Sequence, residues 1–167
     1  MRIAVGSDHA GYALKEQIRP ILEAAGHQVV DVGTTSEEST DYPSYAAQAA
    51  RMVADGDADR AVLACGSGVG VSIVANKVDG VRAVNAHDAV EAEMSRRHNN
   101  ANVLALAGRR LEVGDAEGIV EVFLATAFEG GRHQRRVGQI TAVERGEQPG
   151  ITTDPVRIRR PGWGTRS

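Results

Sequence analysis

Residues 61–75 read AVLACGSGVGVSIVA, and this stretch decides how the chain folds. An apolar run is followed by a glycine-rich turn and a second apolar run, a pattern that predicts a strand, a tight turn and the start of a helix. The single cysteine, Cys65, then lies at the carboxyl end of a buried strand, against free backbone N–H groups. Such a position binds anions and favours the thiolate. Taken alone, the segment is more typical of a structural turn with a small apolar cysteine.

Strand-like runs alternate with helical patterns on both sides of this stretch. We expect strands near residues 3–6, 27–32, 61–64, 81–84 and 103–107, with helices between them and a last helix over 135–147. Pro20 falls inside the first helical pattern, so we expect a kink or a break there. The alternation predicts an α/β fold with a parallel sheet covered by helices on both faces. Residues 148–167 are rich in Pro, Gly and Arg without periodicity, so we expect one domain over 1–147 and an extended or disordered tail.

Bulk properties exclude several classes of protein. A net charge of −3 draws the chain neither to nucleic acid nor to anionic lipid, and an aromatic content of 4% argues against base stacking. No apolar run approaches the roughly 18 residues of a membrane span, and the first residues lack signal-peptide architecture. One cysteine excludes an internal disulfide framework and suits a reducing compartment. We therefore expect a cytoplasmic protein without membrane or nucleic-acid partners.

Polar and reactive residues follow several of the predicted strands. In open parallel sheets, ligands bind outside the carboxyl ends of the strands, so we expect these residues to form one site. Asp8 also fits a helix N-cap, with His9 as a surface neighbour. The residues that follow the first, third, fourth and fifth strands are Asp8 and His9; Cys65, Gly66, Ser67, Gly68 and Gly70; Asn85, His87 and Asp88; and Arg109.

The segment His98-Asn99-Asn100-Ala101-Asn102 ends a predicted helix. A polar C-terminal cap would explain one or two of these residues. A histidine that titrates near neutral pH, next to asparagines that both donate and accept hydrogen bonds, also suits proton transfer and polyol recognition.

A basic run, Arg132-His133-Gln134-Arg135-Arg136, joins Arg109 as a cationic group. Basic runs are usually solvated helix surfaces. Positive charge at the start of a helix opposes the helix dipole, however, which indicates an external anion, and the arginine fork matches phosphate.

The sequence lacks the motifs of several other kinds of binding or catalytic site. The chain has no GxxxxGK[ST] motif, no dinucleotide fingerprint at its first strand, no HExxH and no serine nucleophile elbow. We therefore expect no cofactor and no metal.

Six motifs together resemble the type B ribose-5-phosphate isomerase family, within the superfamily that also holds the galactose-6-phosphate isomerase subunits. They occur in family order over residues 1–147 and leave out the tail. The motifs are Ser7-Asp8-His9-Ala10-Gly11, Asp41-Tyr42-Pro43, Cys65-Gly66-Ser67-Gly68-Val69-Gly70, Ala75-Asn76-Lys77, His98-Asn99-Asn100 and Gly131-Arg132-His133-Gln134-Arg135-Arg136.

The resemblance implies a three-layer α/β/α Rossmann-like sandwich with a five-stranded parallel sheet. It also implies a metal-free aldose–ketose isomerase, a homodimer with active sites shared between subunits, and leaves open whether dimers pair into tetramers. Val71 stands where one branch of the family has a glutamate, so this chain resembles the cysteine-base branch.

The resemblance also implies roles for single residues. Cys65 would be the base, Ser67 and the loop N–H groups of Gly66, Gly68 and Gly70 the anion hole, and His98 the ring-opening residue, reaching across from the partner. Asp8 and Asn99 would bind hydroxyls or assist ring opening. The phosphate-binding set would be His9, Arg109, Arg132, His133 and Arg136.

The expected reaction is the interconversion of ribose 5-phosphate and ribulose 5-phosphate through a cis-enediolate. Three alternatives stay open. The substrate could be a tetrose phosphate such as erythrulose 4-phosphate, or a hexose 6-phosphate such as allose or galactose 6-phosphate. The protein could bind a sugar phosphate without catalysis. It could also be a flavodoxin-like or nucleotide-binding module, which would carry a bound flavin or nucleotide.

Overall fold

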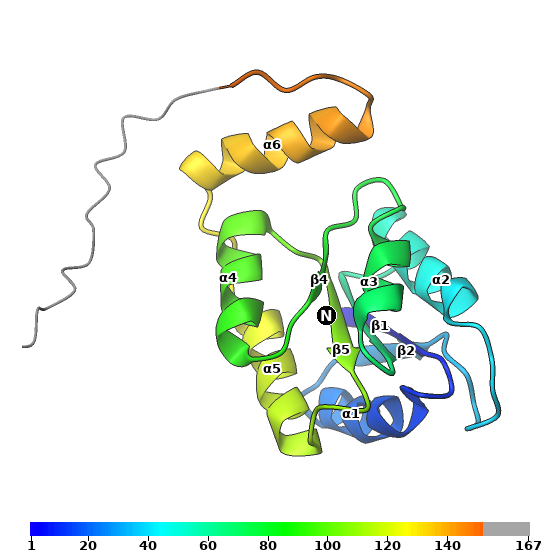
Figure 1. The fold of residues 1–167 in the computed structure, drawn as a ribbon. Coiled ribbons are helices and arrows are strands. Elements are labelled where there is room, and N and C mark those ends of the chain that lie inside the picture. Colours follow the sequence, from blue (N-terminus) through cyan, green and yellow to red (C-terminus); the bar gives the residue numbers. More distant parts are fainter. Residues whose placement is uncertain (152–167) are drawn as a thin grey trace, which may run out of the picture.

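Five short strands form one parallel sheet in the order β2-β1-β3-β5-β4. The computed structural model describes residues 1–151 (Figure 1). The strands are β1 Arg2–Ser7, β2 Gln28–Asp31, β3 Arg60–Cys65, β4 Ala83–Asn85 and β5 Val103–Ala107. The helices are α1 Tyr12–Ala24, α2 Tyr42–Ala54, α3 Val69–Ala75, α4 Ala89–Asn99, α5 Val113–Ala125 and α6 Arg132–Glu144.

Helices cover both faces of the sheet. Leu14 and Ile18 of α1 and Phe123 of α5 pack with Ile3 and Leu104 on one face, where α4 also contributes. The other face carries the alanine-rich side of α2 and the buried side of α3, around Leu63 and Val103. Small side chains on α2 let that helix lie close to the strands. The predicted three-layer α/β/α fold with a five-stranded parallel sheet is confirmed.

Of the kink or break predicted at Pro20, the break is wrong, because α1 continues through this residue to Ala24. A proline inside a helix removes one backbone hydrogen bond. Here Ile18 and Leu22, on either side of Pro20, are both buried in the core. Their packing holds the helix together across the missing bond.

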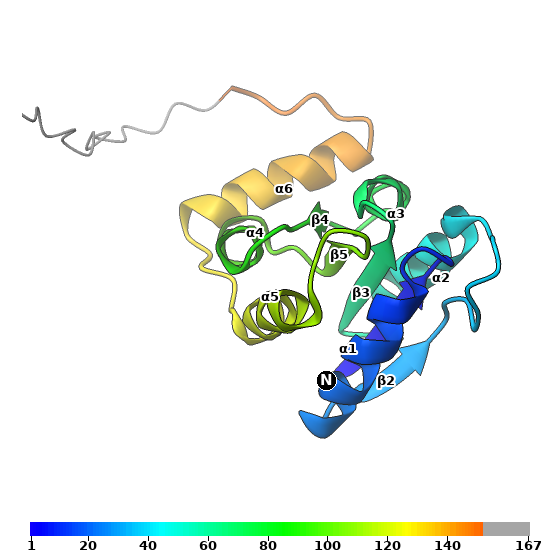
Figure 2. The same ribbon diagram turned by 60° about the horizontal axis from the view of Figure 1, so that its bottom comes forward.

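The last helix begins at Arg132, three residues before the predicted start. It lies beside α4 and apart from the sheet (Figures 1 and 2). Its apolar row is only partly covered, since Val137 is buried while Ile140 and Val143 are 37% and 59% exposed. This leaves α6 with an apolar face toward solvent within residues 1–151.

Most of the predicted tail, residues 152–167, lies outside the described residues, and 148–151 form no helix or strand. Within the described part of the chain, no helix has the length and hydropathy needed to cross a bilayer.

Candidate active site

The glycine-rich loop joins the end of β3 to the start of α3 and binds the cysteine sulfur. Gly68 has φ +75°, and a Cβ there would lie 2.2 Å from the Asn85 Oδ1, so only glycine fits. The Gly68 N–H donates to the Cys65 Sγ at 3.2 Å. Asn85, at the end of β4, donates from its Nδ2 to the Ser67 carbonyl at 3.1 Å. The Gly68 N–H is therefore held next to the sulfur.

Cys65 is at the boundary between the core and a cleft. Its side chain packs with the apolar residues under α2 and α3 and is 5% exposed. It also lines a cleft of about 740 Å³ at the carboxyl edge of the sheet, together with Asp8, His9, Ser67 and Arg109. A mostly buried sulfur facing a cleft that carries polar side chains can act on a bound molecule while being shielded from bulk water.

Asp8 and His9 each bond to the backbone through one side-chain atom, and both residues line the cleft. The Asp8 Oδ1 accepts from the N–H groups of Ala10 and Gly11, each at 3.0 Å, and so caps the turn before α1. The His9 Nδ1 lies 3.2 Å from both the backbone nitrogen and the carbonyl oxygen of Thr40, so the Thr40 backbone holds this side of the ring. The second carboxylate oxygen of Asp8 and the Nε2 of His9 are not used by these bonds.

Tyr42 also lines this cleft, although no role was predicted for it. A Cβ on Gly70 would lie 2.7 Å from the Tyr42 ring, so the loop glycine and the ring are in close contact. The available signal was the Asp41-Tyr42-Pro43 motif, with an aromatic residue at the first position of a helix.

A second cluster forms where α4 ends and α6 begins. The rings of His98 and His133 stack with centroids 4.2 Å apart and an interplanar angle of 6°. Arg132 donates from Nε to the His133 Nε2 at 3.3 Å. The Glu129 Oε2 lies 3.7 Å from the His98 Nε2. This cluster contains three of the residues predicted for proton transfer or phosphate binding. Asn99 follows His98 on α4, and Arg136 lies about one turn after Arg132 on α6.

His133 is buried, and its pKa is lowered. Desolvation is the largest cause, followed by the nearby charges of His98 and Arg132, while Glu129 acts in the opposite direction. The neutral form of His133 is therefore favoured.

Within one chain, the cleft around Cys65 and the cluster around His98 and His133 lie at opposite ends of the strands. At the amino ends β5 pairs Val103 with Ala61, and at the carboxyl ends it pairs Ala107 with Cys65. These two pairs are about 13 Å apart at 3.3 Å per residue. α4 runs back from the carboxyl edge, and its last turn, with His98 and Asn99, lies at the amino edge. Arg109 lines the cleft at the carboxyl edge, so the predicted cationic group is also divided.

His98, Glu129 and His133 hold potential metal-ligand atoms within 4.8 Å of one another, a group that sequence spacing did not indicate. Imidazole lone pairs lie in the ring plane. Because the two rings are nearly parallel and stacked, one ion cannot lie in both planes. The group suits proton transfer better than metal binding.

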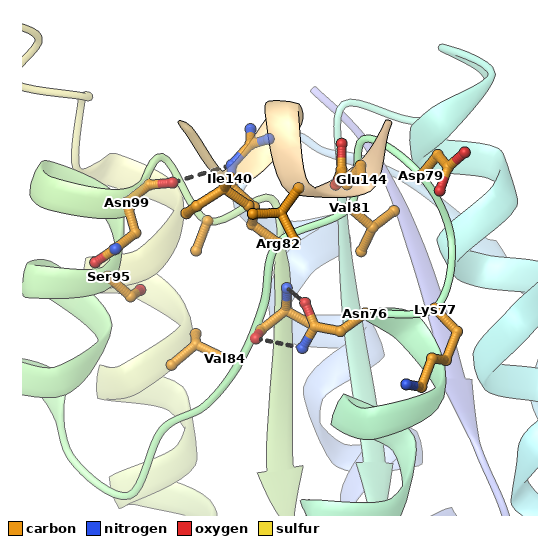
Figure 3. Close-up of a pocket in the computed structure, with 13 residues that line it drawn as sticks. Asn76, Lys77, Asp79, Val81, Arg82, Val84, Ser95, Asn99, Ile140 and Glu144 are labelled. Atoms are coloured by element: carbon orange, nitrogen blue, oxygen red, sulfur yellow. Dashed lines mark hydrogen bonds between the residues drawn. The ribbon is translucent and has the colours of Figure 1, made fainter. Parts of the chain in front are cut away.

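A groove of about 560 Å³ lies between α6, the end of α4 and the loop after α3 (Figure 3). Ile140 and Val143 of α6 form an apolar side of this groove, and Asn99 lies on the α4 side. Arg82 donates from Nε to the Asn99 carbonyl at 3.0 Å. The groove therefore borders the cluster at the amino edge.

Comparisons with known proteins agree with one another. The model of the ribose/galactose isomerase family matches residues 3–140. The chain is 49% identical over 143 residues to ribose-5-phosphate isomerase B of Escherichia coli, covering 86% of this chain and 96% of that protein. It is 43% identical over 132 residues to D-erythrulose-4-phosphate isomerase 2 of Mycolicibacterium smegmatis, covering 77% and 87%. The solved structure of Clostridium thermocellum ribose-5-phosphate isomerase B superposes with a TM-score of 0.86 at 45% identity, covering 87% of this chain and 99% of that one.

Proposed function

Because the chain belongs to the ribose/galactose isomerase family, we propose that it interconverts ribose 5-phosphate and ribulose 5-phosphate. It is an aldose–ketose isomerase of sugar phosphates. The observation that carries the catalytic part of the proposal is the contact between the Cys65 sulfur and the Gly68 N–H, at the edge of a cleft with His9 and Arg109.

Isomerisation needs a base for the proton on C2 of the aldose and a group that stabilises the enediolate. We assign the base to Cys65, which takes the proton from C2 and returns it to C1, while the proton on O2 passes to O1 in the enediol intermediate. The N–H groups of Gly66, Gly68 and Gly70, with the Ser67 hydroxyl, would hold the developing negative charge. Removing one such donor typically costs about 10²–10³ in rate.

Phosphate is the remote anchor of the substrate. His9 and Arg109 line the cleft and can bind it from one chain. Arg132 and Arg136, with His133, would complete the phosphate site from the partner chain. The free energy of phosphate binding holds C1 and C2 of the sugar next to the Cys65 sulfur.

The reaction also needs an acid that opens the furanose ring, and we assign it to His98, with Asp8 and Asn99 binding hydroxyl groups. His98 and Cys65 lie at opposite edges of the sheet within one chain, so one chain cannot apply both to one sugar. A homodimer with active sites shared between subunits resolves this. Exposed apolar residues next to both sites support a dimer. They are Val69 and Ile73 on α3, which follows the Cys65 loop, and Ile140 and Val143 on α6, which lies beside α4.

A tetrose phosphate is the second candidate substrate, since a relative at 43% identity is named for erythrulose 4-phosphate. We also propose that the enzyme is cytoplasmic and that residues 1–147 form the catalytic domain, followed by a separate tail.

A direct assay of the purified protein tests the function. Ribose 5-phosphate, erythrulose 4-phosphate and allose 6-phosphate are compared side by side, with kcat/KM as the measure. We expect the highest value for ribose 5-phosphate. A higher value for erythrulose 4-phosphate would transfer the assignment to the tetrose, and no turnover of any of them would reject an isomerase.

A further inference from the structure

Glu129 lies in the connection between α5 and α6 and contacts the last turn of α4. Its backbone N–H donates to the Arg97 carbonyl at 3.0 Å. Its Oε2 lies 3.2 Å from the Arg97 Nη2 and 3.7 Å from the His98 Nε2. One residue thus contacts two consecutive residues of α4 through both backbone and side chain.

The His98 imidazole is bounded on two sides. The ring of His133 covers one face, and the Glu129 carboxylate lies at the Nε2 edge. A separation of 3.7 Å is longer than a hydrogen bond, so the carboxylate lies beside this edge without bonding to it. The Nε2 atom can therefore still form a hydrogen bond with an oxygen atom of a substrate.

Glu129 also supplies negative charge in a group that otherwise holds cations and imidazoles. Arg132 and Arg136 both act electrostatically on His133, and Arg97 pairs with Glu129 itself. Removing the carboxylate would take away the negative charge beside the His98 Nε2, and this edge of the imidazole would lose the attraction that holds it in place.

We infer that Glu129 is a positioning residue that holds the His98 imidazole for opening the sugar ring, an inference that rests on the proposed function. Ring opening needs a proton delivered to the ring oxygen along a defined direction. Enolisation at Cys65 does not involve His98, so loss of Glu129 affects one step and leaves the other intact.

The chain offers a matched control. Glu93 pairs with the same Arg97, at 3.0 Å, and its side chain is 43% exposed against 44% for Glu129. The Glu93 carboxylate has no ion pair with His98 among those of the described residues. Glu93→Gln therefore removes a comparable surface charge next to Arg97 without changing the neighbour of the imidazole.

The test measures two reactions of Glu129→Gln, Glu93→Gln and the unmodified protein. The first is isomerisation of ribose 5-phosphate, which is mostly cyclic. The second is the exchange of C1 protons of ribulose 5-phosphate in D₂O, followed by NMR. Ribulose 5-phosphate cannot close a furanose ring because its O5 carries the phosphate, so this exchange needs enolisation only.

We expect Glu129→Gln to lower isomerisation about tenfold while the exchange stays within about twofold. Glu93→Gln should change neither rate, and Glu129→Asp should recover part of the isomerisation. Equal loss of both reactions in Glu129→Gln, or no loss of either, would overturn the positioning role. Absence of both reactions in the unmodified protein would instead reject the proposed function.

Discussion

The imidazole of His133 lies flat against that of His98, with ring centroids 4.2 Å apart. Because His133 is buried and has cationic neighbours, protonating it in the folded chain is unfavourable. The neutral form of the ring that packs against the proposed ring-opening histidine is therefore favoured. This arrangement links the stability of the α4–α6 contact to pH.

The first prediction concerns this pH dependence. The pKa of His133 is lowered below its usual 6.5, so between the lowered value and 6.5 the unfolded chain binds a proton that the folded chain lacks. The free energy of unfolding should therefore rise with pH across this window and level off above about 6.5. Urea titrations at several pH values would measure it. His133→Gln should show a weaker rise, and an unchanged slope in that variant would assign the effect to other groups.

Replacing Cys65 tests the proposed base. Cys65→Ala and Cys65→Ser should both lose at least about 10³ in kcat for ribose 5-phosphate, because neither alanine nor an ordinary hydroxyl can take the proton. Binding of the substrate, measured by calorimetry, and the thermal unfolding curve should change little. Near-normal turnover by Cys65→Ala would remove the sulfur from the mechanism.

Mixing two defective variants tests the shared site. Each proposed site takes Cys65 from one chain and His98 from the other. In a heterodimer of Cys65→Ala and His98→Asn chains, one site therefore contains both substitutions and the other contains neither. After subunit exchange, random pairing makes half of the dimers mixed, each with one intact site of two, so about a quarter of the unmodified activity should return. Each variant alone, treated in the same way, is the control. A mixture no more active than the average of its components would show that Cys65 and His98 act within one chain or not together.

The glycine loop gives a prediction about stability. Gly68→Ala places a side chain at φ +75° and drives its Cβ against Asn85 and the backbone of Leu106, so we expect a loss of at least about 2 kcal/mol and a strong loss of activity. Gly56→Ala is matched, since its φ is +80° and nothing lies within 4 Å of the added Cβ. It should cost only the backbone strain, about 1–2 kcal/mol, with activity retained. Equal effects in the two variants would show that the contact with Asn85 is unimportant.

Much of the fold follows from local patterns. β5 matches its predicted range, and each end of the other four strands differs from the prediction by one or two residues. The start of α6 was missed because Arg132 and His133 are polar and read as a turn. In the structure, the buried ring of His133 makes this turn part of the helix.

The two halves of the candidate site differ in how far sequence could predict them. Asp8, Cys65 and Arg109 each follow a strand, and parallel strands end at one edge, so their proximity follows from topology. Glu129 and His133 come close to His98 because the chain passes the end of α4 after α5. This depends on how the helices pack, which local sequence patterns do not predict. Tyr42 was missed for the same reason, because its contact with Gly70 joins the first turns of α2 and α3, which are far apart in the sequence.

The division of reactive groups between opposite edges of the sheet has a consequence for how the enzyme behaves on dilution. If every working centre requires two chains, specific activity is not a constant of the polypeptide but falls once the concentration drops below the dissociation constant of the pair. Assays at nanomolar enzyme would then report assembly as much as chemistry, and added sugar phosphate, by bridging both chains, would hold them together.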